Sequence, residues 1–412
     1  SEVVITATRS SKAVEKLPGA VTVISQRELA SQYAVADDPS AALALYVPGY
    51  APSRQKLTSQ GESLRGRQPL ILLDGIPQST PLRNGSREGY FADSAIIERI
   101  EVINGASAIQ GMGATGGIIN YITKSPRKLG TTSSVHVRAT TQFESDSTDW
   151  KTGYTLGHKT EAFDMLVYAG VQRRGVAYDG QGRRVGLDAV QGDTMNSKGD
   201  DVFFKIGKDF ADQRVQLTVN RFNMEGQGEY RTVPAILAQG IPTSSARGTP
   251  PGTPPRNEAQ AVSLDYRHAS LGGGSLSTQL FKQDFTALYG AATSSTFQDA
   301  RIAPLGTLFD QSEIVADKHG AKLTYVRPDT LVDGLEATLG IDHLNDNTRQ
   351  RLAITGRTWV PPLEFTATAP FAQLEYELGA FTVRGGLRRE FAKLHVDSYT
   401  TLAAYGNQLV QG

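Results

Sequence analysis

The sequence contains no cysteine in its 412 residues, which excludes a disulfide framework and a metal site built on thiolates. Its 42 Lys and Arg residues balance 42 Asp and Glu residues, so the chain lacks the excess of cations that bulk binding to nucleic acid requires. Its six histidines are scattered, with no pair one helical turn apart, so a zinc or haem site is not indicated. We therefore predict no resident cofactor, no metal site and no nucleic-acid partner.

Long hydrophobic runs are also absent. No stretch of about eighteen or more consecutive apolar residues occurs, so the sequence predicts no membrane-spanning helix. This absence leaves a membrane β-barrel open, because barrel strands alternate apolar and polar residues and give almost no hydropathy signal. The first residues carry neither a charged n-region nor an apolar h-region, and we expect any signal peptide to have been removed.

The first 127 residues or so have the pattern of a compact mixed α/β unit. Short apolar runs predict strands at 20–24, 70–73, 97–103 and 117–123. Segments 25–33 and 38–46 predict helices. Ser25 is a suitable N-cap for the first, and a Pro-Gly pair ends the second.

After Ser125-Pro126 the pattern changes to apolar residues at every second position. About eleven such stretches lie near 131–142, 151–158, 162–173, 201–210, 214–224, 260–268, 275–285, 320–327, 334–344, 363–378 and 381–394. Tight turns alternate with long loops, and the predicted long loops are 178–200, 225–259, 286–319 and 345–362. Short turns at one rim and long loops at the other are typical of an outer-membrane barrel.

A glycine-rich motif at 111–116 fits G-x-G-x-x-G. In a dinucleotide-binding fold this motif follows a strand and opens a helix. Here a helical turn precedes it and the predicted strand follows it, so we reject dinucleotide binding. We expect its glycines to permit positive φ and close backbone packing.

Seven segments of the first 127 residues form an ordered set: EVVITATR (2–9), LPGAVTVI (17–24), VPGY (47–50), LRGR (64–67), ILLDGI (71–76), IERIEVING (97–105) and GGIINYITK (116–124). Together they resemble the plug domain of TonB-dependent outer-membrane receptors. The Arg-Gly-Arg segment and the glycine-rich segment are most similar to those of aerobactin-type receptors, which take up ferric hydroxamate–citrate siderophores.

The resemblance implies an antiparallel membrane β-barrel of about 22 strands with an α/β plug in its lumen. It assigns residues 1–9 to a TonB box and linker, 10–127 to the plug and 128–412 to barrel strands. Barrels near eight strands are filled by their own side chains, so about eleven strands do not enclose a plug. We therefore expect this chain to carry about half of the barrel and to be a fragment or a partly represented protein.

The function that the resemblance implies is TonB-dependent uptake of a ferric siderophore across the bacterial outer membrane, without enzymatic chemistry. Iron is carried only within the siderophore complex. The implied partners are TonB with its inner-membrane energising complex, the ferric siderophore, and outer-membrane lipid and lipopolysaccharide, for a monomeric receptor. A catecholate, haem or cobalamin ligand, an outer-membrane signalling receptor, and an outer-membrane enzyme or autotransporter-like barrel are the alternatives.

The TonB box implied by the resemblance comprises Glu2, Val3, Val4, Ile5, Thr6 and Ala7. An extended segment near a chain end is suited to adding a strand to a partner's sheet edge. The alternative is an ordinary first strand of the plug.

The apical plug loops are the implied site of an anionic ferric complex, which Arg, amide and aromatic groups suit. The candidate contacts are Arg54, Gln78, Arg83, Arg87, Tyr90, Phe91, Gln110 and Met112. Arg65 and Arg99 match plug arginines that pair with barrel glutamates in this family, and Glu390 is the candidate partner. All three also fit ordinary lumen-facing polar residues, since barrel interiors are polar.

Overall fold

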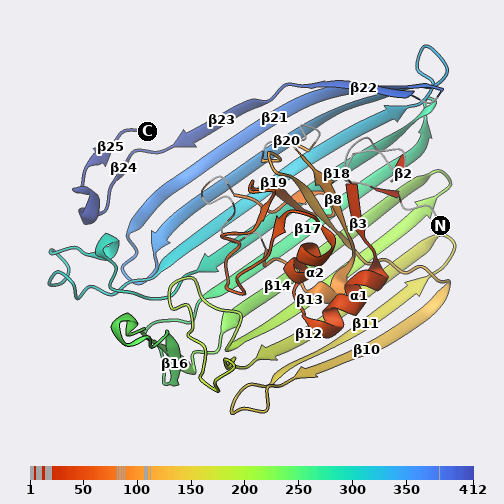
Figure 1. Ribbon diagram of the computed structural model, residues 1–412. Coiled ribbons are helices and arrows are strands. Elements are labelled where there is room, and N and C mark those ends of the chain that lie inside the picture. Colours follow the sequence, from red (N-terminus) through yellow and green to blue (C-terminus); the bar gives the residue numbers. More distant parts are fainter. Residues whose placement is uncertain are drawn as a thin grey trace.

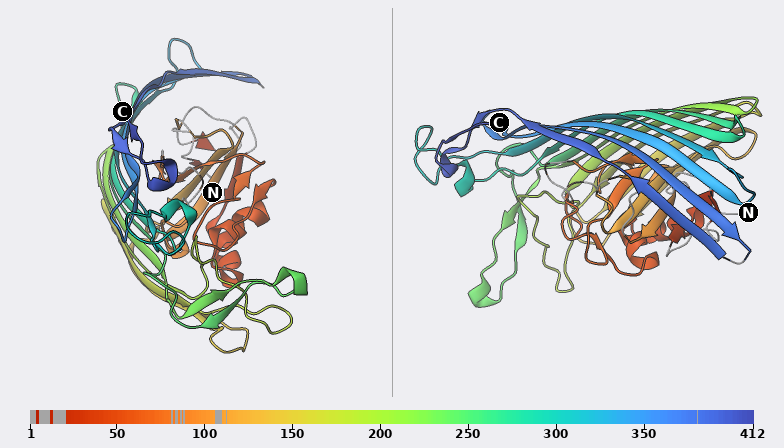
Figure 2. Two further views of the ribbon diagram at one scale, coloured as in Figure 1. Left: turned by 90° about the vertical axis from the view of Figure 1, so that its left-hand side faces the viewer. Right: turned by 90° about the horizontal axis from the view of Figure 1, so that it is seen from above.

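The computed structural model of the chain describes residues 4–5, 12–13, 21–80, 82, 85, 87, 89–105, 110–111, 113–379 and 381–412. A small α/β unit lies against the concave face of a large curved antiparallel sheet (Figures 1 and 2). The described residues contain no helix that is long and apolar enough to cross a membrane. The small unit is called the plug below.

Two short helices of the plug are set by their caps. α1 (Gln26–Val35) follows Ser25, whose side chain accepts from the Glu28 N–H while the Glu28 carboxylate accepts from the Ser25 N–H over 2.7 Å. α2 (Pro39–Tyr46) follows Asp38, whose Oδ1 accepts from the Ser40 N–H over 2.9 Å. Both predicted helices are confirmed.

The plug sheet has five strands in the order β3-β8-β9-β6-β7. Their bounds are β3 (Val21–Ile24), β8 (Ile97–Asn104), β9 (Gly117–Thr123), β6 (Leu70–Leu73) and β7 (Ile76–Pro77). β6 and β9 are parallel and the other pairs are antiparallel. The helices pack on this sheet through a core that includes Ile24, Leu43, Ile100 and Ile119, all fully buried.

Short elements complete the plug. They are β1 (Val4–Ile5) paired with β2 (Lys12–Ala13), β4 (Tyr50–Ala51) paired with β5 (Ser63–Leu64), and the 3-10 turn η2 (Ser94–Ile96). The glycine-rich segment leads into β9, where Gly117 has a φ of +121° and a Cβ would collide with the carbonyl of Ile103. This close approach of two strands accounts for a glycine at that position.

The large sheet has twelve strands, of which the last two lie end to end along β21. Their bounds are β10 (Gly130–Thr140), β11 (Asp149–Lys159), β12 (Phe163–Arg174), β13 (Ser197–Phe210), β14 (Gln213–Gly226), β17 (Arg256–Leu271), β18 (Gly274–Leu288), β19 (Ser312–Arg327), β20 (Leu335–Leu352), β21 (Thr358–Leu378), β22 (Phe381–Arg388) and β23 (Phe391–Val396). Each predicted stretch falls on one of these strands, with the last stretch divided between β22 and β23.

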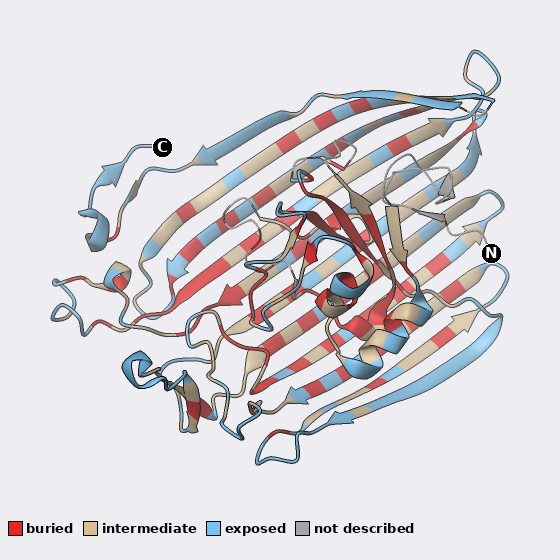
Figure 3. Ribbon diagram, viewed as in Figure 1, coloured by how far each residue is buried: buried red, intermediate tan, exposed pale blue. Residues whose placement is uncertain are grey.

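Polar residues line the concave face of this sheet and apolar residues cover the convex face. On β13, Asp201, Phe203 and Lys205 are buried toward the plug, whereas Val202 on the other face is 49% exposed. Figure 3 shows the resulting alternation of buried and exposed residues along the strands. An apolar outer face and a polar inner face are the arrangement of a membrane barrel wall.

The two ends of the strands differ. At the short-turn rim, strands are joined by turns 160–162, 211–212, 272–273 and 328–334. At the long-loop rim the connections are 141–148, 175–196, 227–255, 289–311 and 353–357. The predicted long loop at 345–362 is wrong, because β20 and β21 remain hydrogen-bonded beyond the end of the apolar alternation.

Further short elements lie in these loops and after β23. They are β15 (Tyr230–Val233) paired with β16 (Ser244–Arg247), β24 (Tyr399–Thr400) paired with β25 (Leu409–Val410), and the 3-10 turns η3 (Leu237–Gln239), η4 (Ser295–Phe297) and η5 (Ala403–Tyr405).

Candidate functional site

The 175–196 loop folds over the plug at the long-loop rim. The Leu57 N–H donates to the Gly192 carbonyl over 3.1 Å, and the Thr194 hydroxyl donates to the Gln55 carbonyl over 2.7 Å. Lys56 forms an ion pair with Asp193, whose side chain is 4% exposed. These contacts hold the 53–60 segment of the plug at this end of the lumen.

Arg87 ties the plug to the same loop and to the sheet. Its side chain donates from Nη1 to Asn257 Oδ1 over 3.0 Å and from Nη2 to the Gln191 carbonyl over 2.7 Å, and its guanidinium lies 4.1 Å from the centre of the Tyr289 ring. The residue is 4% exposed, and burial lowers the pKa of its guanidinium. In this structure the Arg87 side chain therefore links the plug to the 175–196 loop.

Arg54 and Tyr90 lie at the long-loop rim with exposed or partly exposed side chains. The Arg54 Nε donates to the Gln60 carbonyl over 3.0 Å, which leaves its Nη atoms available. The Tyr90 hydroxyl lies 3.3 Å from the Ser53 Oγ. Of these two predicted ligand contacts, Arg54 has polar groups that a ligand at this rim can reach, whereas Tyr90 packs against Leu57, Phe222 and Met224. Arg83 and Met112 lie outside the described residues.

Three other predicted ligand contacts are placed differently from expectation. Phe91 is 6% exposed and packs edge-on against Tyr121 in the plug core, so its ring does not face the loops. Gln78 is buried, with its Oε1 accepting from Gln283 Nε2 of β18 over 2.5 Å. Gln110 is buried on the side of the plug toward the short-turn rim, where its Oε1 is 3.5 Å from Lys322 Nζ.

The predicted ion pairs also differ from the observed ones. Arg99 binds Glu101 of its own strand over 2.7 Å, because inward-facing residues two apart on a strand are neighbours. Glu390 binds Arg388 over 3.2 Å. Arg65 is exposed in a turn with a φ of 55° and has no ion-pair partner among the described residues. In the structure, therefore, neither Arg65 nor Arg99 forms the predicted ion pair with Glu390.

The buried ion pairs between plug and sheet have the opposite polarity, with the cation on the sheet. Lys151 of β11 lies 2.8 Å from Asp37 Oδ2 and 3.1 Å from Ser94 Oγ, and it also binds Asp93. The side chains of Lys151, Asp37 and Asp93 are 14%, 8% and 4% exposed. This cluster is shielded from water, so its charges interact more strongly than a surface pair does.

The surroundings of this cluster extend it into the sheet. The Tyr168 hydroxyl donates to Asp93 Oδ2 over 3.1 Å, and the Asp93 N–H donates to Asp201 Oδ2 over 2.8 Å. Burial disfavours the charge of Asp37, but Lys151 and Arg174 outweigh it and hold the pKa of Asp37 below its usual range. The plug is thus fixed to three neighbouring strands, β11 to β13.

Three more lysines of the sheet donate to carbonyl oxygens of the plug. Lys318 donates to Pro77 over 2.9 Å and to Ser79, and Lys322 donates to Gly75 over 2.5 Å. Lys205 donates to Thr123 over 3.3 Å. These lysines therefore join the sheet to main-chain oxygens of the plug, including those of the β6–β7 hairpin.

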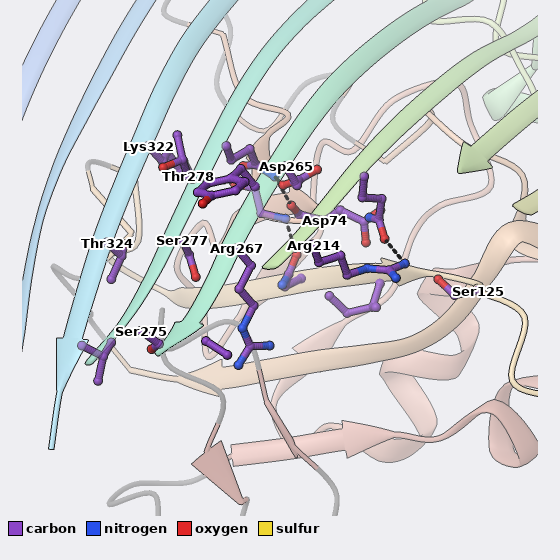
Figure 4. Close-up of a pocket in the computed structure, with 18 of the residues that line it drawn as sticks. Asp74, Ser125, Arg214, Asp265, Arg267, Ser275, Ser277, Thr278, Lys322 and Thr324 are labelled. Atoms are coloured by element: carbon purple, nitrogen blue, oxygen red, sulfur yellow. Dashed lines mark hydrogen bonds between the residues drawn. The ribbon is translucent and has the colours of Figure 1, made fainter. Parts of the chain in front are cut away.

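A cavity of about 890 Å³ separates the plug from the sheet next to the short-turn rim. The plug contributes the turn at Asp74, and the sheet contributes charged and hydroxyl side chains (Figure 4). They include Arg214, Asp265, Arg267, Lys322 and Thr324.

The predicted TonB-binding segment is described only at Val4 and Ile5, which form β1. Glu2, Val3, Thr6 and Ala7 lie outside the described residues. β1 pairs with β2 of the same chain, which fits an ordinary short strand and leaves the TonB-box prediction untested.

The lysines of the sheet were not predicted to contact the plug, although their spacing is visible in the sequence. Lys318 and Lys322 are four residues apart on one strand, so they face the same side. A lysine at an inward position of a barrel strand is a signal for a lumen partner, but the sequence does not identify that partner.

Comparison with known proteins gives three results. A family model described as "TonB-dependent Receptor Plug Domain" matches residues 13–118. A ferric aerobactin receptor of Klebsiella pneumoniae is 26% identical over 430 residues, which cover 96% of this chain and 56% of that protein. A rhizobactin receptor of Rhizobium meliloti (strain 1021) is 26% identical over 433 residues, which cover 97% and 56%. The chain spans about half the length of the curated relatives it matches.

Solved structures share the fold. A ferric enterobactin receptor aligns with a TM-score of 0.68 and 18% identity, over 92% of this chain and 59% of that one. A copper transporter aligns with a TM-score of 0.66 and 15% identity, over 95% and 57%. At such identities the likeness concerns the fold alone.

Proposed function

Since this chain belongs to the family of TonB-dependent outer-membrane receptors, we propose that the complete protein imports a ferric siderophore of the hydroxamate–citrate type across the bacterial outer membrane. The proposed activity is binding followed by translocation, with no chemical step. The siderophore class is supported by the aerobactin and rhizobactin receptors, which align with nearly the whole chain.

The observation that carries a transport role is the way the plug is held. Buried contacts join it to β11, β13 and β19 at several heights of the sheet. Movement of the plug breaks these buried contacts together, so a plug held in this way needs external work to move. We propose that TonB, with its inner-membrane energising complex, supplies that work through residues 2–7.

Ligand binding is proposed at the long-loop rim, where Arg54 and Tyr90 lie. A ferric hydroxamate–citrate complex is anionic, and a guanidinium binds carboxylate oxygens through two parallel hydrogen bonds. The exposed Arg54 side chain retains this capacity. Arg87 lies at the same rim but is used to hold the 175–196 loop.

A binding titration tests the proposed ligand class. Ferric aerobactin, a ferric catecholate, haem and cobalamin are added separately while the intrinsic fluorescence of the protein is recorded. We expect saturable binding of ferric aerobactin alone. Arg54→Met should weaken it at least tenfold, because a hydrogen bond to a charged group contributes about 1.5–3 kcal/mol. Arg327→Met, at the opposite rim, is the matched control. Binding restricted to the other ligands would refute the siderophore class.

A second experiment tests energy coupling. Deletion of residues 2–7 should leave the affinity for ferric aerobactin unchanged and abolish its uptake by cells. Uptake that persists after this deletion would contradict the assignment of these residues to TonB.

A further inference from the structure

Two arginines stand directly opposite each other near the short-turn rim. Strand register pairs Arg214 of β14 with Arg267 of β17. Like charges in this position destabilise a sheet unless each is compensated. Arg214 is compensated by Asp164 at 2.7 Å and Asp209 at 2.9 Å. Arg267 is exposed and has no ion-pair partner among the described residues.

Arg267 faces the cavity of about 890 Å³ between plug and sheet. The register continues from Arg267 to Ser277 of β18 and from Ser277 to Thr324 of β19. The guanidinium and two hydroxyls therefore form one row across three neighbouring strands, and Figure 4 shows them side by side on the cavity wall. All three groups can donate hydrogen bonds into the cavity.

The next row of inward-facing side chains, farther from the short-turn rim, contains Asp265, Gln279 and Lys322, and its polar groups already form hydrogen bonds. Asp265 accepts from Ser263 over 3.0 Å and from Gln279 over 2.9 Å, and Lys322 donates to the carbonyl of Gly75 in the plug turn. The acceptors at the top of the cavity are thus engaged while donors lower down face open space. The lining residues Arg99 and Arg214 are neutralised by Glu101 and by Asp164 and Asp209, whereas Arg267 has no such partner among the described residues. The free donors of the Arg267 row therefore favour an anion.

We propose that this cavity is a second binding site, for an anion that carries carboxylate groups, with Arg267 as its principal contact and Ser277 and Thr324 as further donors. Its volume lies within the range of sites for small molecules, about 300–1,000 Å³. The planar guanidinium matches carboxylate geometry. The lining includes Gly273, Gly274 and Pro328 of the short turns, so the site lies on the opposite side of the plug from the long loops.

This placement gives the site a role that rests on the proposed function. An anionic siderophore complex that has passed the plug meets the Arg267 row before it leaves the short-turn rim. The Asp74–Gly75 turn forms the roof of the cavity, and Lys322 holds that turn in place. Movement of the β6–β7 hairpin would open the cavity toward the ligand side.

Calorimetric titration with citrate tests the site without any siderophore. The protein is the 412-residue chain carrying Arg54→Met, so that binding at the proposed outer site is weakened. We expect saturable citrate binding, no binding of uncharged trimethyl citrate, and at least a tenfold loss of citrate affinity on adding Arg267→Gln. Arg327→Gln is the matched control, because alternation turns Arg327 away from the face on which Val326 lines the cavity. Absent citrate binding, or an unchanged affinity in Arg267→Gln, would overturn the site.

The transit role is tested in the complete receptor in cells. Arg267→Gln should leave the affinity for ferric aerobactin unchanged and lower its rate of uptake at least threefold. An unchanged uptake rate would overturn the transit role. If the unmodified receptor fails to bind ferric aerobactin, the proposed function fails, whereas the citrate titration still decides whether the site exists.

Discussion

Replacement of Lys151 by methionine tests how the plug is held in place. Methionine keeps much of the length of the side chain and removes the ammonium group. In the structure that group contacts Asp37, Asp93 and Ser94, and the two carboxylates are 8% and 4% exposed. The substitution leaves both carboxylates buried without this cation, and Arg174 reaches only the Asp37 carbonyl, over 3.0 Å.

The expected effect follows from this burial. Removing one partner of a buried ion pair costs about 3–5 kcal/mol. A change of about 1.4 kcal/mol is tenfold in an equilibrium constant. Lys151→Met should therefore raise the population of locally opened plug by roughly two to four orders of magnitude.

Hydrogen–deuterium exchange of the backbone amides around η2 and β8 measures this opening. Lys198→Met is the matched control, because Lys198 pairs with Glu225 over 2.9 Å but the two side chains are 59% and 27% exposed. A surface pair contributes about 0–1 kcal/mol, so the control should change exchange by less than about tenfold. Equal exchange rates in the two variants would refute the reasoning that burial makes the Lys151 cluster the stronger tie.

Three further predictions concern other parts of the molecule. Arg87→Met should speed amide exchange in the 175–196 loop at least tenfold, because it removes one buried and one part-buried hydrogen bond. Unchanged exchange would contradict the role of Arg87 as a link to this loop. Gly117→Ala should lower the free energy of unfolding of the plug by about 3 kcal/mol or more in denaturant, because the added Cβ meets the Ile103 carbonyl. Gly105→Ala, where the added Cβ meets nothing within 4 Å, should lower it by about 1–2 kcal/mol. Equal losses would argue against the close approach at Gly117. Asp37 has a lowered pKa in the folded protein, so its contribution to stability is present above its ordinary pKa near 4 and is lost as the pH falls through the lower folded value. Melting temperatures of the native protein and Asp37→Asn should therefore differ at pH 6 and converge only below about pH 4; convergence at pH 5 would contradict this sign.

The sequence alone determined the large sheet and most of the plug. Alternation at every second residue located each strand of the sheet, since this period sets which face a side chain takes. Ser25 located the start of the first helix because capping is a local interaction. The ends of β20 and β21 were missed, since the hydrogen-bonded ladder continues through the polar segment 345–351 of β20, which has no apolar alternation, and through a segment of β21 with prolines at 361 and 362.

The tertiary structure alone decided which polar groups meet. Lys151 binds Asp37 across 114 positions of sequence, and Lys322 binds Gly75 across 247. Local periodicity predicts that such a side chain faces inward, but its partner depends on strand register, on the curvature of the sheet and on how the plug is seated. The same reason explains why Arg267 faces a cavity.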